Sequence, residues 1–274
     1  MELSGHTILI TGGSAGIGLA FARKFVELGN EVIVTGRRRS KLDEVKQLHP
    51  RLHAIHSDVS DPASIAALAA EIKRRFPKLD VLMNNAGSFI MRNLGLPSGD
   101  LVELAAEIET NINGTIRMTS ALIDLIAPNK GTIINVSSAL AYVPLTSAPI
   151  YSASKAAIHS YTTSLRFQLR DAGVRVVELM PPLVKTDMSA GMWDGDFKMI
   201  STDVLVAATI KALKNGALEI RVGQSSQLYW MSRIAPDIIN SQLWKGSRSL
   251  IPKPQNSTGA ETPSVRPPVS TDRA

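Results

Sequence analysis

The sequence contains no cysteine, which excludes structural disulfides, thiolate zinc sites and a cysteine nucleophile. Its five histidines do not stand with matching carboxylates in a metal-ligand pattern, so we expect no metal site. No uninterrupted run of about 18 apolar residues occurs. The N-terminal residues MELSGHTILITGG lack the charged and apolar regions of a signal peptide. These absences predict a soluble, cytoplasmic protein.

Aromatic residues are scarce, at 5 %, and charged residues make up 20 % of the chain. The net charge is +6, but lysine and arginine are scattered, with short runs at 37–39 and 73–75. Because no long basic stripe alternates with aromatic residues, we expect no nucleic-acid partner. Phosphate on a small ligand is an alternative partner for this charge. The 44 % hydrophobic content of 274 residues suffices for the core of one large α/β domain or two small ones.

Short apolar runs alternate with longer helical patterns along the chain. Several of the short runs are apolar throughout, which is typical of strands buried on both faces of a parallel sheet. We therefore expect an α/β fold, a single doubly wound domain whose seven-stranded, mostly parallel sheet has helices on both faces. The expected strands lie near residues 7–11, 31–35, 52–57, 80–85, 131–137, 174–179 and 219–223, and the expected helices near 16–28, 61–75, 100–126, 151–171 and 202–214.

The C-terminal residues differ in composition from the rest of the chain. From Pro252 onward the sequence is rich in Pro, Ser and Thr and has no apolar period, so we assign residues 1–250 to the domain and 251–274 to a disordered tail. The apolar residues of 225–246 predict a helix. Ordinary packing is its favoured role, and the alternatives are that it closes one end of the site, docks on a second subunit or touches a membrane surface.

A glycine-rich turn, 11-TGGSAGIG-18, stands between the first expected strand and the first expected helix. Glycine allows a tight turn and a close approach of the backbone to a ligand, and the N-terminus of the next helix favours a pyrophosphate. The strand before and the helix after are the context that a dinucleotide-binding turn requires. We therefore expect cofactor contacts from Gly12, Ser14, Gly16, Ile17 and Gly18.

The end of the second expected strand predicts the type of dinucleotide. NAD-binding sites commonly have Asp or Glu there, which accepts hydrogen bonds from the ribose 2′-hydroxyl. This chain has Gly36 instead, followed by Arg37 and Arg38. A guanidinium group binds a 2′-phosphate in a bidentate manner, whereas a carboxylate repels it. We therefore expect NADP(H) rather than NAD(H), bound by Arg37 and Arg38; a solvated basic start to the next helix is the alternative for Arg39 and Lys41.

Tyr151 and Lys155 stand four residues apart in an expected helix, so their side chains lie on one face. Such a pair is structural in most proteins, but it also permits acid–base chemistry. The ordinary pKa of a phenol, about 10, is too high for a base near neutrality. A nearby ammonium group and an oxidised nicotinamide both favour the phenolate, so we expect the pKa of Tyr151 to be lowered.

Seven motifs occur together in order: TGGSAGIG at 11–18, Asp58-Val59, NNAG at 84–87, NINGT at 111–115, NVSS at 135–138, YSASK at 151–155 and PPLVKT at 181–186. Over about residues 3–225 the chain resembles the short-chain dehydrogenase/reductase (SDR) family, of the single-domain Rossmann type with a YxxxK active site. The runs around NVSS and YSASK most resemble its DltE-like branch. The resemblance implies an oxidoreductase that transfers a hydride between a nicotinamide cofactor and a carbonyl or alcohol substrate.

The resemblance also implies residue roles. Tyr151 would be the general acid or base, Lys155 would also hold the nicotinamide ribose, and Ser138 would bind the substrate oxygen. Asn111 would help to hold a water-mediated proton path to Lys155. The further cofactor contacts implied are Asp58, Val59, Asn85, Ala86, Gly87, Pro181, Val184 and Thr186.

In two of these motifs, two residues of the same type stand near each other, and residue type alone does not show which one acts in the site. Ser137 competes with Ser138, and Asn113 with Asn111, although the family spacing favours Ser138 and Asn111. Pro182 stands where the family more often has Gly, which removes an N–H near the expected nicotinamide site. A cofactor-sensing protein with little chemistry is an alternative function, but such proteins usually lose the Tyr or the Lys.

The substrate is less specified than the cofactor. Residues 187–200, with Met188, Met192 and Trp193, fit a segment that closes over a substrate, and they suggest a moderately apolar pocket with Leu140, Pro144 and Leu145. Lys185 and Lys198 are the candidates for binding a substrate carboxylate. We expect a small to medium apolar carbonyl or alcohol, and the family implies a homodimer or homotetramer through 100–126 and 151–171.

Overall fold

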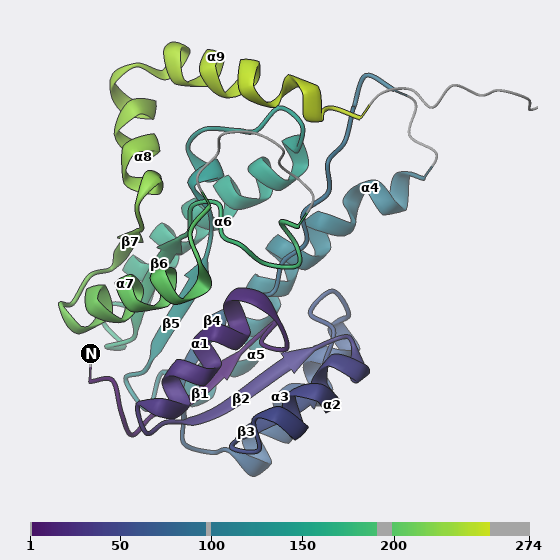
Figure 1. Cartoon of the computed structure of the whole chain (residues 1–274). Helices are drawn as coiled ribbons and strands as arrows, with labels where there is room; N and C mark the ends of the chain where they lie inside the picture. Colours follow the sequence, from purple (N-terminus) through teal and green to yellow (C-terminus); the bar gives the residue numbers. More distant parts are fainter. Residues whose placement is uncertain (1, 97–99, 191–198, 253–274) are drawn as a thin grey trace, which may run out of the picture.

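The computed structural model describes residues 2–96, 100–190 and 199–252. In these ranges seven strands form one sheet, and all its neighbouring strands are parallel. Helices cover both faces of the sheet (Figure 1), as expected for a doubly wound α/β fold. The spatial order of the strands is β3 (Leu52–His56), β2 (Glu31–Gly36), β1 (Thr7–Ile10), β4 (Leu79–Asn84), β5 (Thr132–Val136), β6 (Arg175–Met180) and β7 (Glu219–Arg221).

The described helices agree with the expected ones except at three places. The helix at 39–48 was expected only as a start near Arg39 and Lys41, without an end, and the expected helices at 100–126 and 225–246 are each interrupted. The helices are α1 (Gly16–Glu27), α2 (Arg39–Leu48), α3 (Pro62–Arg75), α4 (Leu101–Ile108), α5 (Gly114–Ile126), α6 (Pro149–Gln168), α7 (Thr202–Lys214), α8 (Gln224–Ile234) and α9 (Pro236–Ser247), with short turns η1 (Glu109–Asn113), η2 (Ala139–Ala141) and η3 (Arg248–Leu250).

The two interruptions have local causes. Between α4 and α5 the chain makes the π-helical turn η1, which contains the buried Asn111. Pro236 has no backbone N–H to continue α8, and it instead occupies the first turn of α9. The single helix expected at 225–246 is therefore wrong: two helices meet there at a sharp bend, at one end of the molecule in Figure 1.

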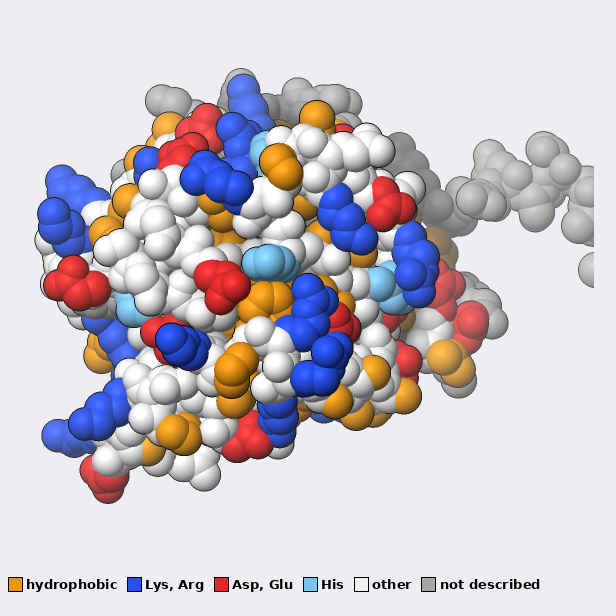
Figure 2. Space-filling model, turned by 90° about the horizontal axis from the view of Figure 1, so that it is seen from below, with side chains coloured by type: hydrophobic (Ala, Val, Ile, Leu, Met, Phe, Trp, Pro, Cys, Tyr) orange, Lys and Arg blue, Asp and Glu red, His pale blue; other side chains and the backbone are white. Residues whose placement is uncertain are grey.

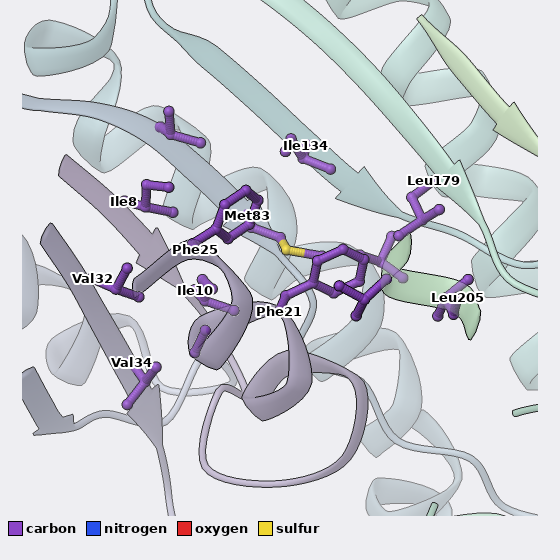
Figure 3. Close-up of a cluster of buried hydrophobic side chains, with 14 of the residues drawn as sticks. Ile8, Ile10, Phe21, Phe25, Val32, Val34, Met83, Ile134, Leu179 and Leu205 are labelled. Atoms are coloured by element: carbon purple, nitrogen blue, oxygen red, sulfur yellow. The ribbon is translucent and has the colours of Figure 1, made fainter. Parts of the chain in front are cut away.

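Two apolar clusters fix the helices to the sheet. The first lies on the face covered by α1 and α7, where Phe21 and Phe25 of α1 stack with ring centroids 6.0 Å apart (Figure 3). The second lies under α3, α5 and α6 and includes Leu82 and Leu122, both fully buried. Because β1 to β6 carry apolar residues on both faces, each of these six strands contributes to both clusters, which is why their sequences do not alternate.

The strand order creates a crevice at the carboxyl ends of β1 and β4. From β1 the chain continues to β2 on one side and returns to β4 on the other. At such a switch point the connections diverge and leave room for a ligand. The glycine turn, Arg37 and Arg38, and the NNAG and NVSS motifs follow strands at this edge, so the topology brings them together.

Charged side chains of both signs lie on the surface of the molecule (Figure 2). On the lower face of the molecule, Lys and Arg side chains are spread among acidic and neutral ones (Figure 2). No helix in the described ranges combines the length and the apolar character that crossing a membrane needs. At the C-terminal side, Asn93 Nδ2 donates to the carbonyl of Pro252 at 3.0 Å. The expected tail beyond 252 and the residues Met192, Trp193 and Lys198 lie outside the described residues.

Candidate active site

A cavity of about 540 Å³ lies along the carboxyl ends of β1, β4, β5 and β6. Three of the four expected catalytic residues line it: Ser138, Tyr151 and Lys155. The expected cofactor residues that line it are Gly12, Ser14, Gly16, Ile17, Arg37, Arg38, Asp58, Val59, Asn85, Ala86, Gly87, Pro181, Val184 and Thr186. Two expected residues, Gly18 and Asn111, stand behind the wall instead.

Gly18 does not line the cavity; it packs against the inner side of the glycine turn. A Cβ atom at Gly18 would come within 2.5 Å of the carbonyl oxygen of Gly12 and 2.6 Å of Asn85 Nδ2. Asn85 Nδ2 donates to the carbonyls of Thr11 and Gly12 at 3.0 and 3.2 Å, so it ties the turn after β1 to the end of β4. Gly18 therefore shapes the turn through close packing.

The end of β2 has no acidic side chain, and any side chain at Gly36 would displace Ser14. A Cβ atom at Gly36 would lie 2.7 Å from Ser14 Oγ. Arg37 and Arg38 follow, line the cavity and are exposed. Neither arginine forms an ion pair within the part of the chain that the structure describes, so both guanidinium groups can bind an anion. Arg39, one residue further, does not line the cavity.

Tyr151 and Lys155 meet at the centre of the cavity wall. Lys155 Nζ lies 5.6 Å from the centroid of the Tyr151 ring and donates to the carbonyl of Val136 at 2.9 Å. Burial lowers the pKa of Lys155 to about 8. The two side chains therefore share one space, as the helical spacing predicted.

The pKa of Tyr151 shifts opposite to the expected direction. Burial raises it to about 12, a hydrogen bond with Ser138 lowers it, and the carboxyl of Glu107 raises it further. Loss of water around a phenolate outweighs the neighbouring groups because the charged form is the one that burial disfavours. The protein's own residues therefore raise the pKa of Tyr151, whereas the sequence analysis expected it to be lowered.

The two serines of the NVSS motif differ in their partners. Ser137 Oγ donates to the buried Glu178 at 2.5 Å, although Ser137 also lines the cavity. Ser138 Oγ accepts a hydrogen bond from Leu140 N at 3.1 Å at the start of η2 and is also hydrogen-bonded to Tyr151. This arrangement keeps the Ser138 hydroxyl next to Tyr151 and commits the Ser137 hydroxyl elsewhere.

Asn111 is buried in η1 and holds the segment after β4. Its Oδ1 accepts from Ser88 N at 2.8 Å, and its Nδ2 donates to Ser88 O and Ser154 Oγ at 3.0 and 2.9 Å. A Cβ atom at Gly87 would lie 3.3 Å from Asn111 Oδ1 and 3.6 Å from Lys155 Nζ. Asn111 and Lys155 therefore both stand next to Gly87.

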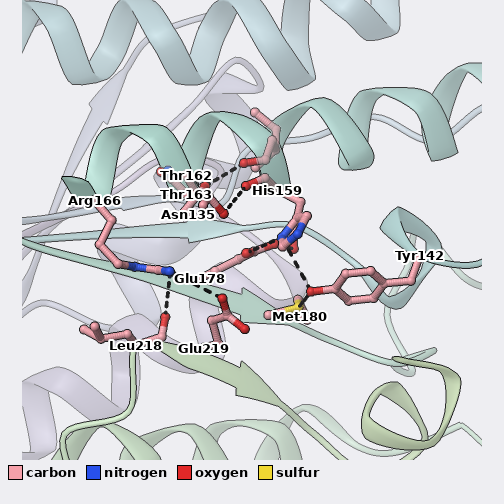
Figure 4. Close-up of polar contacts among 12 residues, drawn as sticks. Asn135, Tyr142, His159, Thr162, Thr163, Arg166, Glu178, Met180, Leu218 and Glu219 are labelled. Atoms are coloured by element: carbon pink, nitrogen blue, oxygen red, sulfur yellow. Dashed lines mark hydrogen bonds and ion pairs between the residues drawn. The ribbon is translucent and has the colours of Figure 1, made fainter. Parts of the chain in front are cut away.

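Behind Ser137 lies a buried ion pair on β6 and α6. Glu178 is fully buried and lies 2.8 Å from His159 Nδ1, and His159 reaches the surface with 26 % of its side chain exposed (Figure 4). The hydrogen bond with Glu178 raises the pKa of His159. The pair connects the cavity wall to the outer side of α6.

The His159 pair predicts how stability depends on pH. Because the folded pKa of His159 lies above its unfolded value of about 6.5, the pair stabilises fully below that pH and its contribution is lost as the pH rises through the folded pKa. We expect the thermal midpoint of the protein to fall across this window more than that of His159→Gln. The control is His53→Gln, which removes a surface imidazole 3.5 Å from Glu31. An unchanged pH slope in His159→Gln would contradict the assignment.

The other end of the cavity is apolar. Phe89, Leu140 and Leu145 line it from the body of the domain. Leu228 of α8 and Leu243 of α9 close it, and they belong to a small apolar cluster with Val143 and Ile239. Of the alternatives for 225–246, the described residues show packing over the cavity. The cationic side chains among the described lining residues are Arg37, Arg38 and Lys155, and Lys185 is exposed and does not line the cavity.

Comparison with known proteins decides the family. The family model described as short chain dehydrogenase matches residues 6–196. The chain belongs to the short-chain dehydrogenase family. It is an oxidoreductase, as this family and the relatives below indicate.

Three relatives place this dehydrogenase within its family. An uncharacterized oxidoreductase DltE of Bacillus subtilis is 38 % identical over 226 residues, which cover 80 % of this chain and 89 % of the relative. The NADP-dependent 3-hydroxy acid dehydrogenase YdfG of Salmonella typhi is 35 % identical and covers 69 % of this chain and 77 % of its own length. A short chain dehydrogenase from Burkholderia cenocepacia, solved in complex with NADP, aligns with a TM-score of 0.78 at 29 % identity and covers 89 % of this chain and 99 % of its own.

Sequence reasoning missed several residues at the site of this dehydrogenase. Phe89 is the second residue after the predicted NNAG turn, so its position in the sequence was the available signal. Glu107 is fully buried one turn before Asn111 on α4, and a charged residue on an amphipathic helix gave no signal of burial. Leu228 and Leu243 could not be found because only the tertiary fold brings them over the cavity.

Proposed function

We propose that this dehydrogenase transfers a hydride between NADP(H) and a neutral, apolar carbonyl or alcohol, with Tyr151 as the general acid or base. The observation that carries the proposal is that Ser138, Tyr151 and Lys155 line the same cavity as the glycine turn. A polar triad at one point of the wall and a pyrophosphate-binding turn at another fit a nicotinamide dinucleotide that extends between them.

The residues at the end of β2 support NADP(H). Gly36 stands where an acidic side chain would bind a ribose 2′-hydroxyl, and Arg37 and Arg38 offer two guanidinium groups to a 2′-phosphate. The name of the Salmonella relative and the ligand of the Burkholderia structure also include NADP. These observations favour NADP(H) over NAD(H).

The proton chemistry follows from the surroundings of Tyr151. When bound, the reduced cofactor supplies the hydride to the carbonyl carbon. Because burial raises the pKa of Tyr151 to about 12, its phenol carries a proton at neutral pH and can donate it to the substrate oxygen. Ser138 stabilises the charge that develops on this oxygen, and the Lys155 ammonium stabilises the phenolate that remains. The reverse sequence oxidises an alcohol.

The apolar end of the cavity favours an uncharged substrate. A carboxylate there would lose its hydration without a cationic partner among the described lining residues, which costs free energy. This differs from what the name of the 3-hydroxy acid dehydrogenase implies for that relative. We therefore propose that neutral apolar ketones and aldehydes are better substrates than 3-oxo acids of equal length.

A substrate panel tests this proposal. Consumption of NADPH by purified protein is measured by absorbance with matched pairs, a methyl ketone and the 3-oxo acid with the same carbon chain. We expect kcat/KM for the ketone to exceed that for the acid by about tenfold or more, since an unpaired buried charge is more costly than one hydrogen bond. A preference for the acid would overturn the substrate class, and no turnover with NADPH of any carbonyl would overturn the function.

The remaining expectations belong to the same proposal. We propose that residues 1–250 form one cytoplasmic catalytic domain and that it assembles as a homodimer or homotetramer through α4, α5 and α6. Exposed apolar side chains on these helices, Val102, Ile116 and Phe167, support such contacts. Sedimentation velocity measures whether the protein is a monomer, a dimer or a tetramer.

A further inference from the structure

The segment that follows β4 passes along the cavity and is held from behind by α4 and η1. Asn111 binds both backbone polar groups of Ser88, as described above. Two residues further, the backbone N–H of Ile90 donates to Glu107 Oε1 at 3.0 Å. Residues 107 and 111 stand one helical turn apart, so two side chains of the same helical stretch hold the two ends of residues 88–90.

Phe89 is the residue between these two points. It lines the cavity, and its ring centroid lies 4.8 Å from that of Tyr151, with an interplanar angle of 65°. This edge-to-face contact positions Phe89 at the substrate end, directly beside the phenol. The side chain of Phe89 cannot keep this contact if the backbone of residues 88–90 moves.

The burial of Glu107 costs more free energy than one hydrogen bond to a backbone N–H returns. Its side chain is fully buried, its pKa is raised by that burial, and its Oε2 has no hydrogen-bond partner among the described residues. The charge of Arg92 lowers the pKa of Glu107, but the Arg92 guanidinium donates its hydrogen bond to the carbonyl of Glu103 and not to Glu107. Burial of a carboxyl with a single bond costs free energy, so packing alone does not account for Glu107.

We propose that Glu107 is a positioning residue: with Asn111 it fixes the backbone of residues 88–90, so that Phe89 stays against Tyr151 and forms the wall that contacts the substrate. This proposal rests on the proposed function. It assigns Phe89 the selection of substrates next to the reacting carbonyl, and it gives Glu107 an effect on that selection without contact with the substrate.

Two variants of equal size separate the hydrogen bond from the packing. Glu107→Gln keeps an acceptor for Ile90 N, whereas Glu107→Met keeps the volume and removes the acceptor. We expect Glu107→Met to exchange the Ile90 amide hydrogen about tenfold faster and to lose about tenfold in kcat/KM for an apolar ketone, since one lost buried hydrogen bond has about this effect. The Kd for NADPH should stay unchanged in both variants. Glu103→Met, at an exposed position on the same helix, is the control.

A double variant tests whether Glu107 acts through Phe89. Phe89→Ala should lower kcat/KM for the ketone without faster exchange at Ile90, and Phe89→Ala combined with Glu107→Met should be no worse than Phe89→Ala alone. Additive losses would overturn the proposal, as would equal loss in Glu107→Gln and Glu107→Met or unchanged exchange at Ile90 in Glu107→Met. If the unmodified enzyme reduced no carbonyl, the proposed function would fail, whereas the exchange data would still decide whether Glu107 holds this segment.

Discussion

Replacement of Tyr151 by Phe is expected to lower carbonyl reduction by about 10²- to 10⁴-fold, the range for removal of a general acid. The phenyl ring would keep its edge contact with Phe89 and its place 5.6 Å from Lys155 Nζ. Only the hydroxyl, which donates the proton in the proposed reaction, is lost. NADPH should therefore still bind with nearly the same affinity.

The measurement combines two readouts on the same preparations. Steady-state kinetics give kcat/KM, and quenching of protein fluorescence by NADPH gives the Kd. Tyr161→Phe is the matched control, because Tyr161 lies on the same helix but packs into the core under α3 and α5. Activity of Tyr151→Phe within about tenfold of the unmodified enzyme would remove Tyr151 from the acid–base role.

Replacement of Arg37 and Arg38 by Ala is expected to weaken NADPH binding by about 10- to 100-fold and to leave NADH binding nearly unchanged. Both guanidinium groups are exposed at the cavity wall without an ion-pair partner among the described residues. Their proposed partner is the 2′-phosphate, which NADH lacks, and a hydrogen bond to a charged group contributes about 1.5–3 kcal/mol. The advantage of NADPH over NADH should also shrink as salt is added.

The control for this change lies in the same stretch of chain. Arg39→Ala with Lys41→Ala removes the same charge from α2, but neither residue lines the cavity. Fluorescence titrations with both nucleotides at low and high salt compare the two double variants. If the control lost as much NADPH affinity as the Arg37 and Arg38 variant, a general positive field rather than specific phosphate contacts would explain the preference.

The fold was predictable because burial on both faces leaves a mark in the sequence. Every residue of β1 and β5 is buried, and most are apolar on both faces of the sheet. The helix α3 follows Asp61, whose carboxylate accepts hydrogen bonds from Ala63 N and Ser64 N. The π-helical turn at Asn111 and the change of direction at Pro236 were not predicted as breaks. The apolar pattern continues across both, so it predicted no break, although Pro236 was a local signal for the second one.

The site was predictable where its residues belong to one short motif. The glycine turn, Arg37 and Arg38, and the Tyr151–Lys155 pair depend on local spacing, which the sequence contains. Glu107 and Leu243 depend on which helix packs beside which loop. The protein's own residues raise the Tyr151 pKa instead of lowering it for a similar reason: the charges around a phenol can be named from the sequence, but the amount of water it loses cannot.

Because α8 and α9 come last among the described α-helices, the residues that cover the apolar end of the cavity are separate in sequence from the glycine turn and the Tyr151–Lys155 pair. The match to the family model ends at residue 196, and it includes the glycine turn, Tyr151 and Lys155. Leu228 and Leu243, which cover the apolar end of the cavity, come after the last strand, beyond Gly223. In evolutionary terms, substitutions in this terminal segment can change one wall of the apolar end of the cavity while the glycine turn, Tyr151 and Lys155 stay as they are.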